Sequence, residues 1–297
     1  MTMYGSIEGG GTKFVCAVGN TPDDIVSELT IPTTTPDETL ARVVSFFTEH
    51  GPLDAIGLAM FGPIDLDHAS PTYGYVTSTP KPGWSGTDVV GRLESALDVP
   101  VGFDTDVNGA ALGEGRWGAA QGLDTFIYIT VGTGVGGGGV VNGEPLHGLV
   151  HPEIGHMRIP RFPGDNFAGT CRYHGDCLEG LVCGPAIAAR WGRPAQELGD
   201  DTARAVELAG HNLGHAMANL VVTVSPQLII IGGGVAKLPG LIEATRERVL
   251  ESLAGYVQSA ELENGAIDFL VRPGLGDRAG IAGGFVLAER AVSHRRR

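Results

Sequence analysis

Residues 5–19 read GSIEGGGTKFVCAVG, and this stretch decides the fold. Two apolar runs flank a cluster of glycines, which predicts a strand, a tight turn and a second strand. A third predicted strand, IVSELTIP, follows at residues 25–32. The pattern returns at residues 124–146, where DTFIYITVG leads through another glycine run into GVVNGEPL. Each hairpin precedes segments that predict alternating strands and helices, so the sequence predicts a duplicated α/β architecture.

The length of the chain favours two domains. The sequence has 297 residues, which is long for one hydrophobic core. We expect an N-terminal α/β domain at residues 1–117 and a C-terminal α/β domain at residues 118–278. The cleft between two such domains is the default place for a ligand. A closing helix within residues 279–297 is expected to pack back on the first domain.

Composition and charge exclude several classes of protein. Hydrophobic residues make up 42% of the chain and charged residues 18%, so the chain can bury a core and is not disordered. The net charge is −14, which disfavours nucleic acid and anionic membranes as partners, because both need a basic surface. The first residues, MTMYGSIEGGG, contain no charged leader with an apolar core, so we expect a cytoplasmic protein.

Three glycine turns follow predicted strands, at residues 9–13, 132–136 and 232–235. Glycine lets backbone N–H groups approach a phosphate closely, and the threonine hydroxyls add donors. The third turn leads to the start of a helix, which favours anions. Any one of these turns alone is most simply a tight hairpin, but three in a duplicated topology favour phosphate binding. The glycines of residues 132–137 also match a dinucleotide motif, but a strand follows them where that motif needs a helix.

Two aspartates, Asp104 and Asp106, follow a short predicted strand. A kinase that phosphorylates a hydroxyl group needs one carboxylate to accept the proton, while Mg²⁺ and positioning supply most of the catalysis. An aspartate before a helix can instead cap the free N–H groups of that helix. Position alone favours the cap for either residue, so both roles stay open at this point.

The segment CRYHGDC at residues 171–177 contains a metal-ligand pattern. Cys171, His174 and Cys177, together with the earlier His156, supply four nitrogen and sulfur ligands, the set that structural Zn²⁺ takes. Two thiolates and two neutral imidazoles would leave the zinc site without net charge. The alternative is a pair of reduced thiols beside two surface histidines.

Four further histidines compete with this pattern or resemble it. His147 and His151 lie close to the segment in sequence and are rival ligands. His211 and His215 stand one turn apart on a predicted helix, but they lack the glutamate of a His-Glu-x-x-His motif. We expect this second pair to be surface or core histidines of the helix.

Together these elements resemble the ROK family of sugar kinases and repressors, and its bacterial fructokinase branch in particular. The similarity covers essentially the whole chain and rests on an ordered series of segments: GSIEGGGTKFVCAVG, FGPID, STPKPGW, DTDVNGAALGE, VGTGVGGG, HPEIGHM, CRYHGDCLEG and IIIGGGV. The resemblance implies two actin-like, ribonuclease H-like domains, with ATP and sugar in the cleft between them. It also implies Mg²⁺ with the ATP, a structural Zn²⁺ and a homodimer.

The resemblance assigns roles to particular residues. It places the catalytic base at Asp106 and gives His156 contacts with both sugar and zinc. It also implies the sugar and ATP contacts that follow. The implied sugar contacts are Gly62, Pro63, Thr105, Asp106, Glu153, His156 and Glu179. The expected ATP contacts are Gly10, Gly11, Thr12, Lys13, Thr133, Gly134, Pro185, Gly233, Gly234, Val235, Ala236 and Lys237.

Three departures from the family pattern bear on the substrate. Thr105 replaces the usual Asn before the base, Glu8 replaces the usual Asp, and the cysteine motif of the broad family becomes Cys-x2-His-x2-Cys. The last two are similar to the fructokinase branch and favour transfer of phosphate from ATP to the 6-hydroxyl of D-fructose. The alternatives are a kinase for glucose, mannose or another hexose, and a sugar-sensing protein without enzymatic activity. The eight residues before the first glycine turn argue against the helix-turn-helix of such a sensor.

Overall fold

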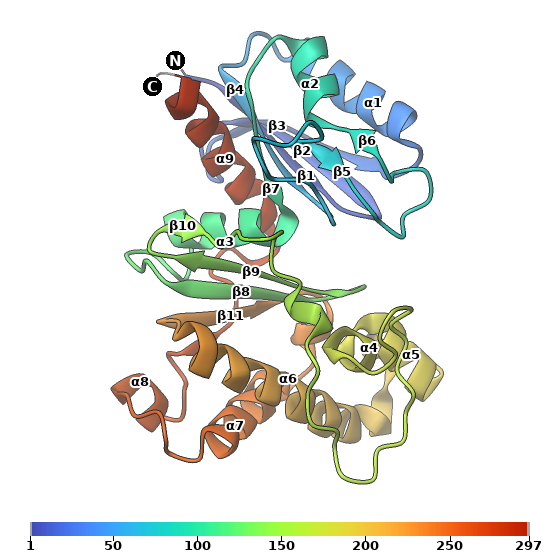
Figure 1. The fold of residues 1–297 in the computed structure, drawn as a ribbon, viewed down its shortest axis with the longest axis vertical. Coiled ribbons are helices and arrows are strands. Elements are labelled where there is room, and N and C mark those ends of the chain that lie inside the picture. The colour runs from blue at the N-terminus through green and yellow to red at the C-terminus, as the bar shows by residue number, and fades with distance from the viewer. Residues whose placement is uncertain (1, 296–297) are drawn as a thin grey trace. The chain divides into compact units, whose positions relative to one another are not determined.

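The computed structural model describes residues 2–295, which form two compact units (Figure 1). Unit 1 takes the described residues of Met1–Gly122, Pro145–Pro152 and Gly274–Arg297, and unit 2 takes Leu123–Glu144 and Glu153–Pro273. Residues 145–152 therefore belong to unit 1, whereas the sequence predicts them in the C-terminal domain. The last two residues of the expected closing helix, 296 and 297, lie outside the described part of the chain.

The described residues of unit 1 form a five-stranded sheet in the order β3-β2-β1-β4-β7. Strand β1 is antiparallel to β2, which is antiparallel to β3, whereas β1, β4 and β7 run parallel. The strands are β1 (Tyr4–Gly9), β2 (Lys13–Gly19), β3 (Ile25–Pro32), β4 (Ala55–Met60) and β7 (Val101–Thr105), with a small separate pair, β5 (Tyr75–Val76) and β6 (Thr87–Asp88).

Helices cover both faces of this sheet because its strands are apolar on both sides. On β2, Phe14, Cys16 and Val18 pack into one core. The alternating Val15 and Ala17 pack into another, as the two-residue period of a strand requires. The first core includes α1 and α2, and the second includes α9. The helices of unit 1 are α1 (Pro36–Glu49), α2 (Val90–Leu97), α3 (Asp106–Trp117) and α9 (Ala279–Arg295).

Helix α9 lies unusually close to its neighbours because glycines line the contact. A Cβ atom on Gly57 of β4 would sit 1.7 Å from the carbonyl oxygen of Gly284. A Cβ on Gly283 would sit 1.8 Å from the carbonyl oxygen of Gly109 on α3. Neither position can accept a larger side chain unless the helix moves. The last part of the chain is thereby packed onto β4 and α3 of the first unit.

Unit 2 repeats the topology of unit 1. The order in its five-stranded sheet is β10-β9-β8-β11-β12, with β8 antiparallel to β9 and parallel to β11. The strands are β8 (Phe126–Val131), β9 (Val135–Val141), β10 (Glu144–Pro145), β11 (Leu228–Gly232) and β12 (Leu270–Val271). The helices are α4 (Leu178–Val182), α5 (Gly184–Trp191), α6 (Thr202–Val224), α7 (Leu241–Leu253) and α8 (Ala260–Glu263). Short 3₁₀ helices are η1 (Ile154–His156), η2 (Ala195–Glu197), η3 (Gly199–Asp201), η4 (Val235–Lys237) and, in unit 1, η5 (Gly276–Arg278).

Glu114 joins two of the four places where the chain passes between the units. Its side chain on α3 is fully buried and accepts hydrogen bonds from the backbone N–H groups of Ala119 at 2.7 Å and of Gly274 and Leu275 at 2.9 Å each. The chain first enters unit 2 after residue 122 and makes its last return to unit 1 at residue 274. One buried carboxylate thus fixes both connections, and the three donors offset the cost of burying its charge.

Among residues 2–295, no helix combines the length and the apolar character that crossing a lipid bilayer needs.

Candidate active site and metal centre

One edge of the sheet in unit 1 gathers three predicted functional segments. In the parallel ladder Gly9 of β1 pairs with Met60 of β4, and Met60 pairs with Thr105 of β7. The three strands therefore end level with one another. The glycine turn at 10–13 follows the first strand, Gly62 and Pro63 follow the second, and Asp106 follows the third. The carboxyl ends of neighbouring parallel strands are the usual place for a ligand in α/β proteins.

The glycine turn of residues 10–13 is braced by Thr33 at the end of the neighbouring strand. The Thr33 hydroxyl donates to the carbonyl oxygen of Gly10 at 2.7 Å, and its N–H donates to the carbonyl oxygen of Thr12 at 2.9 Å. The Gly10 N–H closes the turn by donating to the carbonyl oxygen of Lys13. Residues 11–13 stay exposed, so this part of the predicted nucleotide site is held in place while it faces solvent.

The N-cap of α3 is Thr105, and this settles one question that position left open. The Thr105 hydroxyl accepts a hydrogen bond from the Asn108 N–H at 3.1 Å, which is the bond of an N-cap side chain. Asp106 is the first residue of the helix, it is partly exposed, and its Oδ1 accepts from the N–H of Val107 at 2.9 Å. Helix capping therefore does not need the Asp106 carboxylate.

Residues 145–152 form a strap whose two histidines both bond within unit 1. His147 Nε2 lies 3.0 Å from Oδ2 of Asp104, whose side chain is buried. His151 is buried as well, and its Nε2 accepts from the N–H of Ile64 at 3.2 Å. Each of the two rival zinc ligands thus bonds to a residue of unit 1: His147 to Asp104, two residues before Asp106, and His151 to Ile64, next to Pro63.

Three predicted nucleotide segments of unit 2 are adjacent. The Gly184 N–H donates to the carbonyl oxygen of Gly132 at 2.7 Å, which places the start of α5 and its exposed Pro185 beside the turn that contains Thr133. Gly233 has a φ of +92°, and a Cβ there would sit 2.4 Å from the carbonyl oxygen of Val131. This close approach needs glycine and sets the third turn against the end of β8.

The third turn exposes its residues unequally. Gly234 and Lys237 are exposed, but the side chains of Val235 and Ala236 are buried in the core of unit 2. A nucleotide there would therefore meet the backbone of those two residues and not their side chains.

The predicted sugar residues of unit 2 flank the metal-ligand pattern. Glu179 on α4 accepts a hydrogen bond from the Val135 N–H at 3.0 Å, so its carboxylate lies against the turn of residues 132–134. Glu153 is exposed and is the residue before η1, which ends at His156. A Cβ on Gly155 would sit 1.9 Å from the carbonyl oxygen of Val135, so η1 packs tightly on β9.

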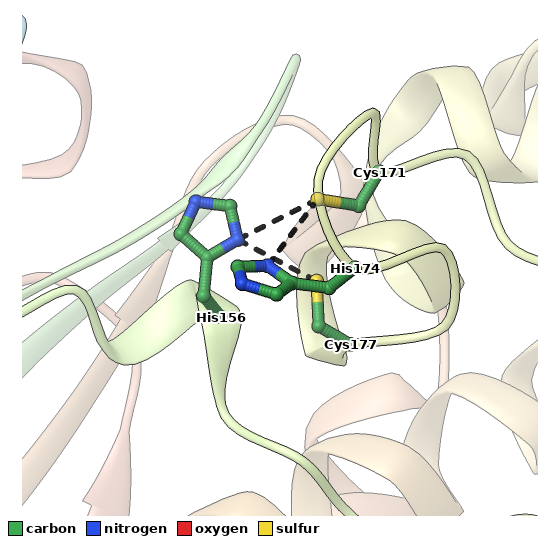
Figure 2. Close-up of side chains that lie close together, drawn as sticks. All are labelled: His156, Cys171, His174 and Cys177. Atoms are coloured by element: carbon green, nitrogen blue, oxygen red, sulfur yellow. Dashed lines mark hydrogen bonds between the residues drawn. The ribbon is translucent and has the colours of Figure 1, made fainter. Parts of the chain in front are cut away.

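Figure 2 shows that the side chains of His156, Cys171, His174 and Cys177 point toward one another. Their donor atoms all lie within 4.8 Å of one another. His156 Nδ1 lies 3.7 Å from Cys171 Sγ and 3.5 Å from Cys177 Sγ, and His174 Nδ1 lies 3.7 Å from Cys171 Sγ. In a tetrahedral zinc site, Zn–S and Zn–N bonds of about 2.3 and 2.05 Å place sulfur and nitrogen about 3.6 Å apart. Both the donor set and the spacing therefore fit Zn²⁺.

The chain around the cluster is folded so that the ligands converge. Cys171 and Gly175 exchange two backbone hydrogen bonds, and Gly175 has a φ of +65°, so the segment closes into a tight turn. Cys177 is the residue before α4 and is fully buried. Burial raises the pKa of the Cys177 thiol to about 11. A bound cation would have to displace that proton, as metal binding to thiols generally does.

His211 and His215 lie on α6, as the sequence predicts, and form an edge-to-face pair with ring centroids 4.5 Å apart. His211 is buried and its Nε2 lies 3.2 Å from the carbonyl oxygen of Pro160, while its Nδ1 has no partner among the described residues. Burial lowers the pKa of His211, and the nearby Arg248 lowers it further. Burial also lowers the pKa of His215, with a further contribution from His211. Both rings are therefore neutral in the folded protein at neutral pH.

The pair predicts an acid-sensitive stability. Because the folded pKa of His211 lies below the unfolded value of about 6.5, the unfolded chain binds more protons below that pH. The free energy of unfolding should therefore fall as the pH drops below about 6.5. His211→Gln keeps a donor for Pro160 and removes the titration, so its unfolding free energy should fall less between pH 7.5 and pH 6. Urea unfolding at several pH values measures this, with the exposed His68→Gln as control. Equal slopes in the variant and the wild type would contradict the prediction.

The two repeated sheets define a duplicated α/β protein of the actin-like, ribonuclease H-like class. A model of the ROK family matches residues 4–291. The chain is 45% identical over 293 residues to a fructokinase of Zymomonas mobilis, covering 96% of both proteins. It is 42% identical over 292 residues to a fructokinase of Pediococcus pentosaceus, covering 98% of this chain and 99% of the relative. The solved structure of a ROK hexokinase from Thermus thermophilus has a TM-score of 0.79, 28% identity and 99% coverage of both chains. The chain belongs to the ROK family, and the predicted family and fold class are confirmed.

Sequence reasoning missed the roles of four residues around this site. It noted Asp104 only as a candidate base or cap and His147 only as a rival metal ligand, and it gave no role to Asn108 or Glu114. A buried acidic residue that accepts a bond from a residue 43 or 161 positions away leaves no local pattern. Only the hydrophobic surroundings of Glu114 in a small-residue helix hint at its burial.

Proposed function

We propose that this protein is an ATP-dependent fructokinase, which transfers the γ-phosphoryl group of ATP to the 6-hydroxyl of D-fructose. The products are fructose 6-phosphate and ADP. The observation that carries the proposal is the sequence identity of 42–45% to two named fructokinases over nearly the whole chain. The glycine turns and the acidic residue at the sheet edge support the same reaction class.

Asp106 is the proposed catalytic base. It would accept the proton of the 6-hydroxyl as the oxygen attacks the γ-phosphorus in line and ADP leaves. Such a transfer depends mainly on positioning and on electrostatic stabilisation, because the transition state is loose. Asp106 suits this role because it begins a helix, is partly exposed, and has its cap function supplied by Thr105.

The glycine turns are the proposed nucleotide site, with Mg²⁺ bound as the partner of ATP. Backbone N–H groups of residues 10–13, 132–134 and 233–237 would face the nucleotide. Lys13 and Lys237 are exposed at two of these turns and supply positive charge in a chain whose net charge is −14. Pro185 would contact the nucleotide from the start of α5.

The proposed fructose contacts come from both units. We propose that Glu153, His156 and Glu179 bind sugar hydroxyl groups in unit 2. Gly62, Pro63 and Thr105 are the proposed contacts in unit 1. Zn²⁺ on His156, Cys171, His174 and Cys177 would be structural, and would hold the segment that bears Glu153 against the helix that bears Glu179. We also propose that the protein is cytoplasmic and forms a homodimer.

A sugar panel tests the proposed function. Purified protein with Mg²⁺ and ATP is assayed for ADP release with D-fructose, D-glucose, D-mannose and N-acetylated hexosamines. We expect kcat/KM for fructose to exceed that for each other sugar by about tenfold or more, because hydroxyl-specific contacts discriminate strongly. A higher value for glucose or mannose would assign the other hexose. No sugar-dependent ADP release at all would leave a sugar-sensing role.

A further inference from the structure

The carboxylate of Asp104 is a buried charge beside the proposed catalytic base. Its side chain is only 3% exposed, and it stands two residues before Asp106. Oδ1 accepts from the N–H of Thr105 and from Nδ2 of Asn108, each at 2.7 Å. A buried charge without full hydrogen bonding is costly, so every donor around it affects its position.

The strap of residues 145–152 supplies the remaining donor. His147 Nε2 lies 3.0 Å from Oδ2 and 3.2 Å from Oδ1 of Asp104. An imidazole nitrogen that faces a carboxylate at this distance must carry its hydrogen, and both the Nε2–H tautomer and the imidazolium do. The bond is charge-assisted and thus stronger than a neutral one.

The same carboxylate controls the start of α3. Asn108 turns its amide nitrogen to Asp104 even though its Oδ1 is then buried without a partner in the described chain. The backbone N–H of Asn108 donates to Thr105, the N-cap residue, and Asp106 is the next residue. Asp104 therefore holds both ends of the capping turn from which the Asp106 side chain projects.

We propose that His147 is a positioning residue of the kinase reaction, which acts through Asp104 and Asn108 to hold the Asp106 carboxylate for proton transfer. This inference rests on the proposed function, because it takes Asp106 as the base. His147 donates to Oδ2 of the buried Asp104 carboxylate. Without this donor, the carboxylate must rotate or bind a water molecule through Oδ2. Either change tilts the capping turn, and proton transfer is sensitive to small displacements of the base.

A second anchor ties the other end of the strap to the neighbouring loop. His151 accepts from the Ile64 N–H, and its ring carbon and Nε2 lie 3.3 Å from where a Cβ on Gly62 would sit. The strap is therefore fixed to the loop after β4 and to the end of β7, which hold the proposed sugar contacts of unit 1. Glu153, another proposed sugar contact, follows the strap directly in sequence.

Three substitutions of His147 separate hydrogen-bond donation from bulk. His147→Gln keeps a side-chain N–H donor, His147→Leu keeps the volume, and His147→Ala keeps neither. Because the His147 side chain is 40% exposed, all three variants should fold, with zinc content and thermal midpoint measured on each. His68→Ala, at an exposed histidine that stacks on Tyr73, is the matched control.

We expect kcat to fall about 10- to 100-fold in His147→Leu and His147→Ala, because a buried carboxylate loses a donor. KM for ATP should stay within about twofold, and His147→Gln should keep kcat within about fivefold of the wild type. Wild-type kcat in the Leu and Ala variants would overturn the proposal, and so would a Gln variant as slow as Leu. The wild-type sugar panel is a separate control. If another hexose is the better substrate, the His147 variants are compared with that sugar. The panel alone then decides the fructose proposal.

Discussion

Asp106→Asn should lower kcat about a thousandfold, the middle of the range that a positioned general base contributes. KM for ATP and for fructose should change by less than about threefold, because the substitution alters charge and leaves shape unchanged. Steady-state kinetics with a coupled ADP assay would measure both parameters. A loss confined to kcat identifies a group that acts in the transition state.

The substitution should leave the local hydrogen bonds of the Asp106 region unchanged. The Asn side chain can still accept from the Val107 N–H with its oxygen, as Oδ1 of Asp106 does at 2.9 Å. The N-cap bond belongs to Thr105 and is not touched. The variant should therefore fold with nearly wild-type stability, so any loss of activity reports chemistry.

Asp37→Asn is the matched control, since Asp37 also lies in the first turn of a helix and is exposed. It should keep full kcat. If Asp106→Asn kept more than about a tenth of wild-type kcat, the general base would have to be assigned elsewhere. Asp104, whose carboxylate is fully engaged with Thr105, Asn108 and His147, would then be the next residue to test.

Cys177→Ala should abolish zinc binding and lower the thermal midpoint by about 10 °C or more. Structural zinc contributes directly to folding free energy, and for a chain of this size each kcal/mol moves the midpoint by about 2–4 °C. The remaining Cys171, His156 and His174 offer only three ligands to the metal. Metal analysis should give about one zinc per wild-type chain and close to none in the variant.

The activity of Cys177→Ala should fall mainly through KM for fructose. Glu153 lies three residues before one ligand, and Glu179 lies two residues after another. Without the metal, the turn of residues 171–177 keeps its backbone bonds, the bond from Arg158 to the His174 carbonyl oxygen, and the ion pairs of Asp176 with Arg158 and Arg161. We expect KM for fructose to rise at least about tenfold, because both proposed sugar carboxylates lose a common support.

Cys183→Ala is the matched control for the thiol. Cys183 is buried like Cys177 and lies six residues further along, but it is not among the four converging ligands. Its loss should cost no zinc and only the modest stability of a small buried side chain. A chelated wild-type protein that contained no zinc and kept full activity and stability would refute the structural role of the metal.

Short-range sequence patterns predict much of the candidate site. The glycine turns and the Cys-x2-His-x2-Cys segment are local, and each turn lies at the expected strand end. The fourth ligand, His156, also converges with the other three as predicted. Their chemistry depends on residue types and close spacing, which a linear sequence records directly. The assignments of base, sugar and nucleotide contacts stay predictions until the variants are measured.

Other features required the folded chain. The strap of residues 145–152 follows the second hairpin in sequence, yet its histidines bond to Asp104 and to the Ile64 N–H in unit 1. The three hydrogen bonds that Glu114 accepts come from residues at two connections between the units, near residue 119 and at residues 274 and 275. Such contacts join residues far apart in sequence, and no periodicity or motif encodes them.

The sequence by itself determined the duplicated hairpin-first architecture and the convergence of four candidate metal ligands, since apolar periodicity and ligand spacing encode them. Tertiary structure alone decided that Thr105 caps α3, that Asp104 is buried, and that His147 is its donor. The physical reason is burial: a carboxylate taken out of water must find its donors in three dimensions, wherever they lie along the chain.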